Sequence, residues 1–305
     1  MQQAYNKPAL TIQQQITQLQ QRGMIINDIA AATYYLGYIN YYRLSAYWLI
    51  FESDHVTHTF KQGTTFEQVL NLYIFDRELR LLVLDAIERI EVAIRSQFSH
   101  QLSHQYGAHP HLISALFKAS WDYTYNFSQL QKDAKASKES FAQHLLAKYT
   151  EPLPPIWATV EIMTLGQLSK WYANLQSGAD RNQIAHLFDF DEVNLVSFLH
   201  HITTIRNHCA HHSRLWNREF IFTFKLPRKR PTVLLGSYNQ LAPRHIYNTL
   251  ATLSYMMNQI APGHHWRDRL KNTIHQHQIS EVSIEFSMEV SMRFPVDWKT
   301  RSIWQ

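Results

Sequence analysis

The stretch TFEQVLNLYIFDRELRLLVLDAIERIEVAIRSQFSHQLSHQYG, residues 65–107, decides the fold. Its apolar residues recur every three or four positions, which is the period of one face of an α-helix. Thr65 with Gln68 forms a capping-box pattern at its start, and Gly107 is the first helix-breaking residue after it. A helix of about 40 residues exceeds the usual globular length, so we expect it either to span two structural units or to bend midway.

The rest of the chain also has a mostly helical pattern. We expect helices at about residues 12–22, 28–48, 138–149, 156–175, 192–205 and 243–260. Residues 51–63 show no sustained period and are interpreted as a linker, and residues 220–224 and 232–235 as short extended pieces. The predicted fold class is therefore all-α, with an N-terminal helical region at residues 1–62 and a helical core at residues 63–305.

The composition excludes several classes of protein. A hydrophobic fraction of 45% is too high for global disorder, because the chain can bury enough apolar surface to offset its ordering entropy. The single cysteine rules out an intramolecular disulfide and a cysteine-rich zinc module. No stretch has the length and apolar character of a signal peptide or a membrane span. We therefore expect a cytoplasmic protein without a membrane partner.

The positive charge is concentrated in one region. The chain carries a net charge of +5, whereas residues 201–250 contain eight basic side chains and one acidic side chain, a local charge of +7. The rest of the chain therefore carries −2. The eight basic residues are Arg206, Arg214, Arg218, Lys225, Arg228, Lys229, Arg230 and Arg244. Such a cluster raises the expectation of a polyanionic partner such as RNA.

The same region contains Arg206-Asn-His-Cys-Ala-His211, directly after an amphipathic helix. Asn207 and His211 are four positions apart and share a helix face, whereas Arg206 and His211 lie about 140° apart around a regular helix. A histidine transfers protons near neutral pH, and an arginine binds phosphate and stabilises developing negative charge. Together they suit metal-independent cleavage of RNA by its own 2′-hydroxyl, with Asn207 orienting the imidazole or binding a phosphate oxygen.

Spacing alone makes this signal weak, because Arg95 and His100 repeat it on the long helix. Glu91 and Arg95 are spaced as an ion pair on one helix face, so we favour a structural role for this copy. A second catalytic half-site is the alternative. Glu161, isolated among apolar residues, is either the partner of a buried arginine or a solvent-facing side chain.

Simpler interpretations apply to several residues beside the motif. His208 and His212 are spaced as a metal-binding pair, but a third ligand is missing nearby, so we expect no metal and no other cofactor. Arg214 and Arg218 either stabilise a helix end or pair with Glu219, the single acid of the basic region.

Three further features have both a functional and a structural interpretation. Pro227-Arg-Lys-Arg-Pro231 is either an extended clamp for RNA phosphates or a solvated loop. Cys209 is expected to be a small buried residue rather than a nucleophile. An aromatic cluster has the chemistry to stack bases, but its helical spacing favours core positions with one or two exposed edges. Its members are Tyr34, Tyr35, Tyr38, Tyr41, Tyr42, Tyr47 and Trp48.

The run Arg206-Asn-His-Cys-Ala-His-His-Ser-Arg-Leu-Trp-Asn217 resembles the signature of Abi-like proteins, the AbiD and AbiF abortive-infection group, which belong to the HEPN superfamily. The resemblance extends in order along nearly the whole chain. It includes residues 7–10, 22–23, 39–47, 72–80, 87–95, 153–157, 161, 166–169, 294–298 and 303–304.

This resemblance implies an all-α, HEPN-like helical bundle, a metal-independent ribonuclease activity and a homodimer that pairs two Arg/His sets in one cleft. It implies a role in phage defence, by abortive infection or within a toxin–antitoxin pair, with a noncoding RNA as a further partner. The catalytic residues would be Arg206, His211 and Asn207. The residues expected to bind RNA are His212, Arg214, Arg218, Arg228, Lys229 and Arg230. The alternative is a protein that holds a structured noncoding RNA without cutting it.

Overall fold

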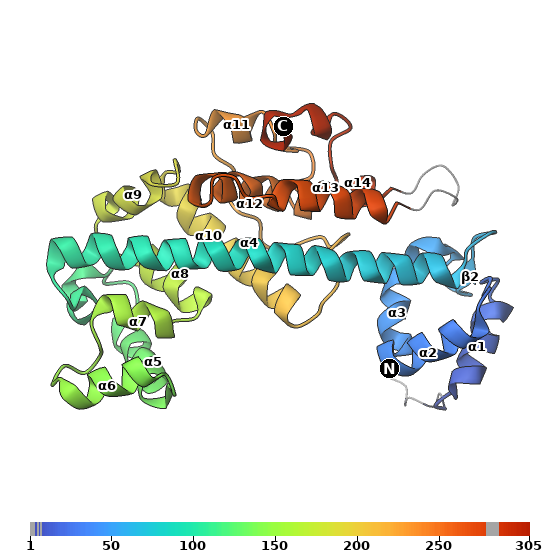
Figure 1. The fold of residues 1–305 in the computed structure, drawn as a ribbon, viewed down its shortest axis with the longest axis horizontal. Coiled ribbons are helices and arrows are strands. Elements are labelled where there is room, and N and C mark those ends of the chain that lie inside the picture. Colours follow the sequence, from blue (N-terminus) through green and yellow to red (C-terminus); the bar gives the residue numbers. More distant parts are fainter. Residues whose placement is uncertain (1–3, 5, 7, 279–286) are drawn as a thin grey trace. The chain divides into compact units, whose positions relative to one another are not determined.

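The structure, a computed structural model, describes residues 4, 6, 8–278 and 287–305. Within these residues it contains fourteen α-helices and one sheet of two short strands, so the prediction of an all-α fold is confirmed (Figure 1). Lys7, at the start of the family resemblance, lies outside the described residues. In the described part of the chain, no helix combines the length and the apolar character needed to cross a membrane.

Helix α4 (Phe66–Tyr106) is the long helix expected from the sequence, and it is 41 residues long (Figure 1). Thr65 Oγ1 accepts a hydrogen bond from the Gln68 amide at 3.2 Å, and Gln68 Oε1 accepts one from the Thr65 amide at 2.9 Å. This reciprocal pair is the predicted capping box. Gly107 follows the helix with a φ of 83°, a left-handed conformation that glycine adopts without steric cost.

The chain divides into two compact units. The first comprises Met1–Arg80 and Leu270–Ser291, and the second comprises Leu81–Arg269 and Met292–Gln305. Helix α4 contributes residues to both units, which is the first of the two outcomes expected from its length. The division into an N-terminal helical region at residues 1–62 and a helical core at residues 63–305 stays a prediction.

In the first unit, three short helices precede a β-hairpin. They are α1 (Ile12–Gln21), α2 (Ile29–Ile39) and α3 (Tyr41–Trp48). The 3₁₀ helix η1 (Leu49–Phe51) leads into the antiparallel strands β1 (Glu52–Asp54) and β2 (Thr59–Phe60), and α14 (Met288–Ser291) also belongs to this unit. The expected helix starts are present, because Thr11 and Gln14 form a capping box and Asp28 caps α2.

The interpretation of residues 51–63 as a linker is wrong. Phe51 and Phe60 are buried at the base of the hairpin, and His55 Nδ1 lies 2.8 Å from the buried carboxylate of Glu52. These contacts give the segment its own packed structure. Strands of two and three residues are too short to show an alternation of apolar and polar residues, so the sequence pattern does not reveal them.

The aromatic cluster of α2 and α3 is only partly buried. Tyr47 lies in the core, whereas Tyr34, Tyr38 and Tyr42 are 60%, 79% and 85% exposed. The prediction of a mostly buried cluster is therefore wrong for these three side chains. Helix α2 buries only Ala32 and Leu36, so its tyrosines lie on the solvent side of a helix whose core-facing residues are smaller.

The second unit contains the C-terminal part of α4 and the helices of the basic region. Its other α-helices are α5 (Tyr123–Ala136), α6 (Ser140–Lys148), α7 (Ile156–Ile162), α8 (Leu165–Ala173), α9 (Gly178–His186), α10 (Glu192–Ala210), α11 (Thr232–Leu235), α12 (Ile246–Ile260) and the start of α13 (Trp266–Gln276). Its 3₁₀ helices are η2 (Pro110–Leu112), η3 (Ser114–Leu116), η4 (Trp298–Thr300) and η5 (Ser302–Trp304). Every residue of α12 from Ile246 to Met257 is buried, so this helix forms the centre of the core.

Two expectations for the second unit are wrong. Residues 156–175 form two helices rather than one, because Thr164 accepts a hydrogen bond from the Gln167 amide at 3.2 Å and starts a new helix. Residues 232–235 form α11 rather than an extended piece. Residues 220–224 are irregular chain that pairs with no described strand.

Candidate functional site

Helix α10 carries the first part of the Arg206–His211 motif. Asp191 caps its N-terminus with a side chain that accepts a hydrogen bond from the Asn194 amide at 2.8 Å, and the helix begins at residue 192, as expected. Its apolar face is buried up to Cys209, the lone thiol, which was expected to be buried. Arg206 and Asn207 are exposed, so the helix presents them to solvent.

Helix α8 packs closely against α10 just before the motif. A Cβ atom on Gly166 would lie 3.4 Å from Thr203 Cγ2, so the absence of a side chain at Gly166 allows the two helices to approach. Thr203 precedes Arg206 by about one helical turn. The position of the Arg206 face is therefore set by a tightly packed helix pair rather than by a loop.

The end of α10 has a defined hydrogen-bond pattern. The His212 amide donates to the Cys209 carbonyl at 3.1 Å, and the Ser213 amide donates to the His208 carbonyl at 2.9 Å. This is the Schellman arrangement, in which the residue after the cap is left-handed, and His212 has a φ of 57°. Leu215, a few residues further on, is fully buried and anchors the chain after the turn.

The strained conformation of His212 leads to a stability prediction. Glycine at this position is expected to raise the free energy of unfolding by about 1 kcal/mol relative to alanine, because glycine accepts a positive φ without a steric penalty. His212→Gly and His212→Ala both remove the imidazole, so the difference between them isolates the backbone term. Urea denaturation measures it, and a glycine variant less stable than the alanine variant would contradict the assignment.

The three motif side chains are exposed but not joined into one network. Arg206 Nη1 lies 3.5 Å from Asn207 Oδ1, which is a long contact for a hydrogen bond. In the described part of the chain, the His211 imidazole takes part in no hydrogen bond and no ion pair. His211 caps the helix, and its amide still donates to the Asn207 carbonyl at 2.9 Å. Arg206 and His211 therefore remain on different sides of the helix end, as their spacing indicates.

Two further basic residues follow the motif and are partly buried. Arg218 Nε donates a hydrogen bond to the Arg214 carbonyl at 2.8 Å, which orders the turn after the helix. The pKa of His208 is lowered, first by burial and then by the nearby positive charge of Arg218. Glu219 pairs with Arg244 at 3.1 Å, an ion pair that is not among the two interpretations given for Arg214 and Arg218.

The histidines of α10 do not converge on a common point. His201 is buried and shares its ring nitrogens with the Phe222 carbonyl at 3.1 Å and Thr249 Oγ1 at 2.8 Å. Burial lowers the pKa of His201 to about 4, so this side chain is a neutral core residue near neutral pH. Among the described residues, no group of three or more histidine, cysteine or acidic side chains is placed to hold a metal ion.

The chain after the motif runs back along α10 toward its N-terminus. The Lys225 amide donates to Ser197 Oγ, and Asn194 Nδ2 donates to the Lys225 carbonyl, each at 2.8 Å. Arg228, Lys229 and Arg230 therefore lie near the start of α10, whereas the motif lies at its end. An α-helix rises 1.5 Å per residue, so roughly 20 Å separate Asn194 from the first residues of the motif. The structure does not bring these three cations to the Arg206–His211 pair, although the sequence places them in one basic region.

The second copy of the Arg-x4-His spacing has a structural role. Arg95 pairs with Glu91 one turn earlier on α4, as expected, and its Nη1 lies 3.3 Å from Glu161 Oε2. Its Nη2 also donates to the Met163 carbonyl at 2.8 Å. Glu161 is thus the partner of a largely buried arginine, the first of its two interpretations. The guanidinium holds the corner between α7 and α8 against α4.

Replacing Arg95 with alanine is expected to lower the free energy of unfolding by about 2–3 kcal/mol, because Glu91 and the Met163 carbonyl then lose their donor. Glu161→Gln is the matched control. The Glu161 side chain is 52% exposed, so the change at this residue is expected to cost less than about 1 kcal/mol. Chemical denaturation compares the two variants, and equal stabilities would exclude the proposed anchoring of the α7–α8 corner.

A family model described as Abi-like protein matches residues 34–217, which is more than half of the chain. The match includes the Arg95 anchor and Glu161, and it ends at Asn217, six residues after His211. The chain belongs to the Abi-like protein family. Membership suggests a role in abortive-infection phage defence. No curated protein and no solved structure matches this Abi-like protein. Residues 225–230, with their cluster of cations, lie outside the matched region.

Proposed function

We propose that this Abi-like protein is a metal-independent endoribonuclease of phage defence, acting in the cytoplasm as an abortive-infection or toxin component. The observation that supports it best is the exposed set of Arg206, Asn207 and His211 on the last turn of α10, at the end of the family match. Two further arginines follow the motif in the chain, and the only acid among residues 201–250 is paired with Arg244, so this segment favours an anionic substrate.

The proposed reaction uses the RNA's own 2′-hydroxyl as the nucleophile. A new bond forms between the 2′-oxygen and the adjacent phosphorus, and the bond from phosphorus to the 5′-oxygen breaks. The proton of the 2′-hydroxyl passes to a neutral imidazole, and a proton is returned to the departing 5′-oxygen. The products are a 2′,3′-cyclic phosphate and a 5′-hydroxyl, and no metal or oxidant enters the balance.

Each motif side chain has a separate role in this scheme. His211 moves the proton, because it is the exposed imidazole of the motif. Arg206 binds the phosphate and stabilises the charge that its oxygens gain in the transition state. Asn207 shares a helix face with His211 and lies beside Arg206, so it contacts the same phosphate or orients the imidazole. His212, Arg214 and Arg218 hold the neighbouring backbone of the RNA.

A homodimer would supply a second proton-transferring imidazole, which the motif of one chain lacks. The reaction requires both a base and an acid, whereas one motif contributes one exposed imidazole beside its arginine. Two copies of the motif facing each other provide both groups, and they also allow the Arg206 of one chain to reach a phosphate beside the His211 of the other. The Arg95 copy does not enter this scheme, because its guanidinium is engaged by two acids and a carbonyl.

The test is cleavage of RNA by the purified full-length chain in the presence of EDTA. We expect cleavage that persists without divalent metal and yields 2′,3′-cyclic phosphate and 5′-hydroxyl ends, with a dimer seen by light scattering. Tight RNA binding without cleavage would replace the proposal with a protein that holds a structured noncoding RNA. A requirement for added divalent metal would contradict the mechanism.

A further inference from the structure

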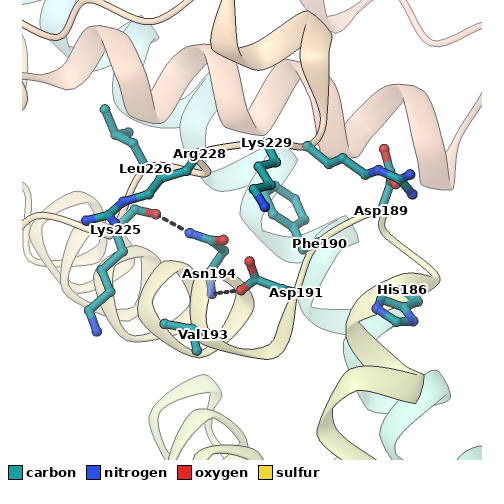
Figure 2. A pocket seen from close by; sticks show the side chains of 11 residues that line it. His186, Asp189, Phe190, Asp191, Val193, Asn194, Lys225, Leu226, Arg228 and Lys229 are labelled. Atoms are coloured by element: carbon teal, nitrogen blue, oxygen red, sulfur yellow. Dashed lines mark hydrogen bonds between the residues drawn. The ribbon is translucent and has the colours of Figure 1, made fainter.

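A pocket of about 730 Å³ lies at the N-terminal end of α10 (Figure 2). One side is formed by the turn between α9 and α10, and the other by residues 225–230. In Figure 2, the side chains of Lys225 and Arg228 lie at one side and His186 at the other, with Asp191 between them. The volume falls within the range of about 300–1,000 Å³ that is typical of small-molecule sites. The pocket lies outside the α10 end that carries the motif.

The pocket is lined by four cations that lack acidic partners. They are Lys225, Arg228, Lys229 and Arg230. Within the described residues, none of the four takes part in an ion pair. The four cations outnumber the two carboxylates that line the same pocket, so an excess of positive charge remains, and an anionic ligand offsets it. Their arrangement around a cavity therefore favours a ligand with several negative charges.

The positions of these cations are set by the fold. The hydrogen bonds of Lys225 to Asn194 and Ser197 fix the start of the segment against α10, and Figure 2 shows the first of these contacts. Pro227 is buried, whereas the three residues after it are exposed. The segment is therefore anchored at one end and presents its cations to the cavity, rather than forming a freely solvated loop.

Two carboxylates line the same pocket and narrow the class of ligand. Asp191 accepts the capping hydrogen bond of α10 through one oxygen, and Asp189 Oδ2 lies 3.3 Å from Tyr255 Oη. Carboxylates repel a bare phosphate chain, but they accept hydrogen bonds from ribose hydroxyls. A ligand that carries both phosphates and hydroxyls can contact the cations with its phosphates and the carboxylates with its hydroxyls.

We propose that this pocket binds a phosphorylated ribonucleotide, with Arg228, Lys229 and Arg230 on the phosphates and Asp189 on the ribose hydroxyls. Free nucleotides and the phosphorylated 5′ end of an RNA share this chemistry. The site lies roughly 20 Å from the motif at the other end of α10, so it is a second site that does not depend on RNA cleavage.

Binding measurements on the full-length His211→Ala protein test this proposal, because RNA then stays intact whatever its fate in the wild type. The probes are ATP, 2′-deoxy-ATP, and one RNA oligonucleotide with either a 5′-triphosphate or a 5′-hydroxyl. We expect replacement of Arg228, Lys229 and Arg230 by alanine to weaken ATP binding by at least about 10-fold, because each lost charge-assisted hydrogen bond costs about 1.5–3 kcal/mol.

The matched control removes the same charge from another surface. Lys132, Lys135 and Lys138 are exposed on and just after α5, and their replacement by alanine is expected to change ATP binding by less than about twofold. If both triple variants weaken ATP binding equally, the effect is due to the net charge of the protein rather than to the pocket, and the proposal is wrong. If ATP binding is weakened by the pocket variant while RNA binding ignores the 5′ end, the ligand is a free nucleotide rather than an RNA terminus.

Asp189→Asn separates recognition of the ribose from recognition of the phosphates. Asparagine tolerates the left-handed φ of 54° at this position, so the turn is expected to be preserved. The protein with Asp189 intact should bind ATP about 5-fold or more tightly than 2′-deoxy-ATP. The Asp189→Asn variant should lose most of this difference in affinity while still binding the phosphates. Identical preferences in both proteins would exclude the role of Asp189.

Discussion

Replacing His211 with alanine is expected to slow RNA cleavage by about 10²- to 10⁴-fold, which is the usual contribution of a general acid or base. The side chain is exposed, so the free energy of unfolding should change by less than about 0.5 kcal/mol. RNA affinity should change little, because the neighbouring arginines remain to bind the phosphate backbone. Single-turnover cleavage in EDTA measures the rate, and a binding assay on the same variant measures the affinity.

Arg206→Ala is expected to lower the cleavage rate by about 10²- to 10³-fold, the range found when one group that stabilises a charged transition state is removed. Arg206→Lys should restore only part of it, because an ammonium cannot form the bidentate contact of a guanidinium. A lysine variant as active as the wild type would therefore contradict a bidentate contact with the phosphate.

The control for both changes is His200→Ala, which removes an exposed imidazole from the same helix away from the motif. This variant should cleave RNA at the wild-type rate. If His211→Ala and His200→Ala cleave equally well in EDTA, His211 does not transfer the proton.

The second large effect expected is acid destabilisation, because two histidines of the second unit are buried and neutral. His111 and His201 are 1% and 3% exposed. Burial lowers the pKa of His111 to about 3 and that of His201 to about 4, from an ordinary value of 6.5. Between pH 6.5 and these lower values, the unfolded chain binds protons that the folded chain does not. The free energy of unfolding must therefore fall as the pH falls through this window.

The size of this effect follows from the shifts. At pH 5, each histidine is expected to have lowered the free energy of unfolding by about 2 kcal/mol relative to pH 7.5, since one pKa unit corresponds to about 1.4 kcal/mol. Most carboxylates are still ionised at pH 5, so the decrease in the free energy of unfolding between pH 6.5 and 5 is attributable mainly to histidines. Urea unfolding at pH 7.5, 6 and 5, followed by circular dichroism, measures the slope.

His201→Gln provides the comparison. The variant loses some of the contacts to Thr249 and the Phe222 carbonyl, so it should be less stable than the wild type at pH 7.5. Its stability should nevertheless depend less on pH, because the proton uptake of one histidine is gone. Wild-type stability that stays constant from pH 7.5 to 5 would contradict the neutral state of both buried rings.

Local features of the fold were accessible from the sequence. The start of α4 depends on a hydrogen-bond exchange between Thr65 and Gln68, and its end on the positive φ of Gly107. Asp191 starts α10 in the same way. Each of these signals acts over a few residues, so the sequence contains the complete interaction. The pairing of Arg95 with Glu91 was accessible for the same reason, because it joins neighbours on one helix face.

Other features were not recognised from the sequence, either because another local pattern concealed them or because they depend on contacts between distant residues. Thr164 has the same capping chemistry as Thr65, but the continuous apolar pattern across residues 156–175 concealed the break that it makes. The exposure of Tyr34, Tyr38 and Tyr42 reflects what the rest of the first unit covers, which periodicity does not report. The pocket at the start of α10 was missed because Asp189 and Asp191 meet the cations of residues 225–230 only in the folded chain.

By itself, the sequence determined the helical class, the long helix and the position of Arg206, Asn207 and His211 at the end of α10. Those properties follow from helical period and from hydrogen bonds within one turn. The tertiary structure alone decided that Arg95 is an anchor across to α7, and that Arg228, Lys229 and Arg230 lie at the opposite end of α10 from the motif. Both depend on contacts between residues at least 28 positions apart, such as that of Lys225 with Ser197, which no local pattern encodes.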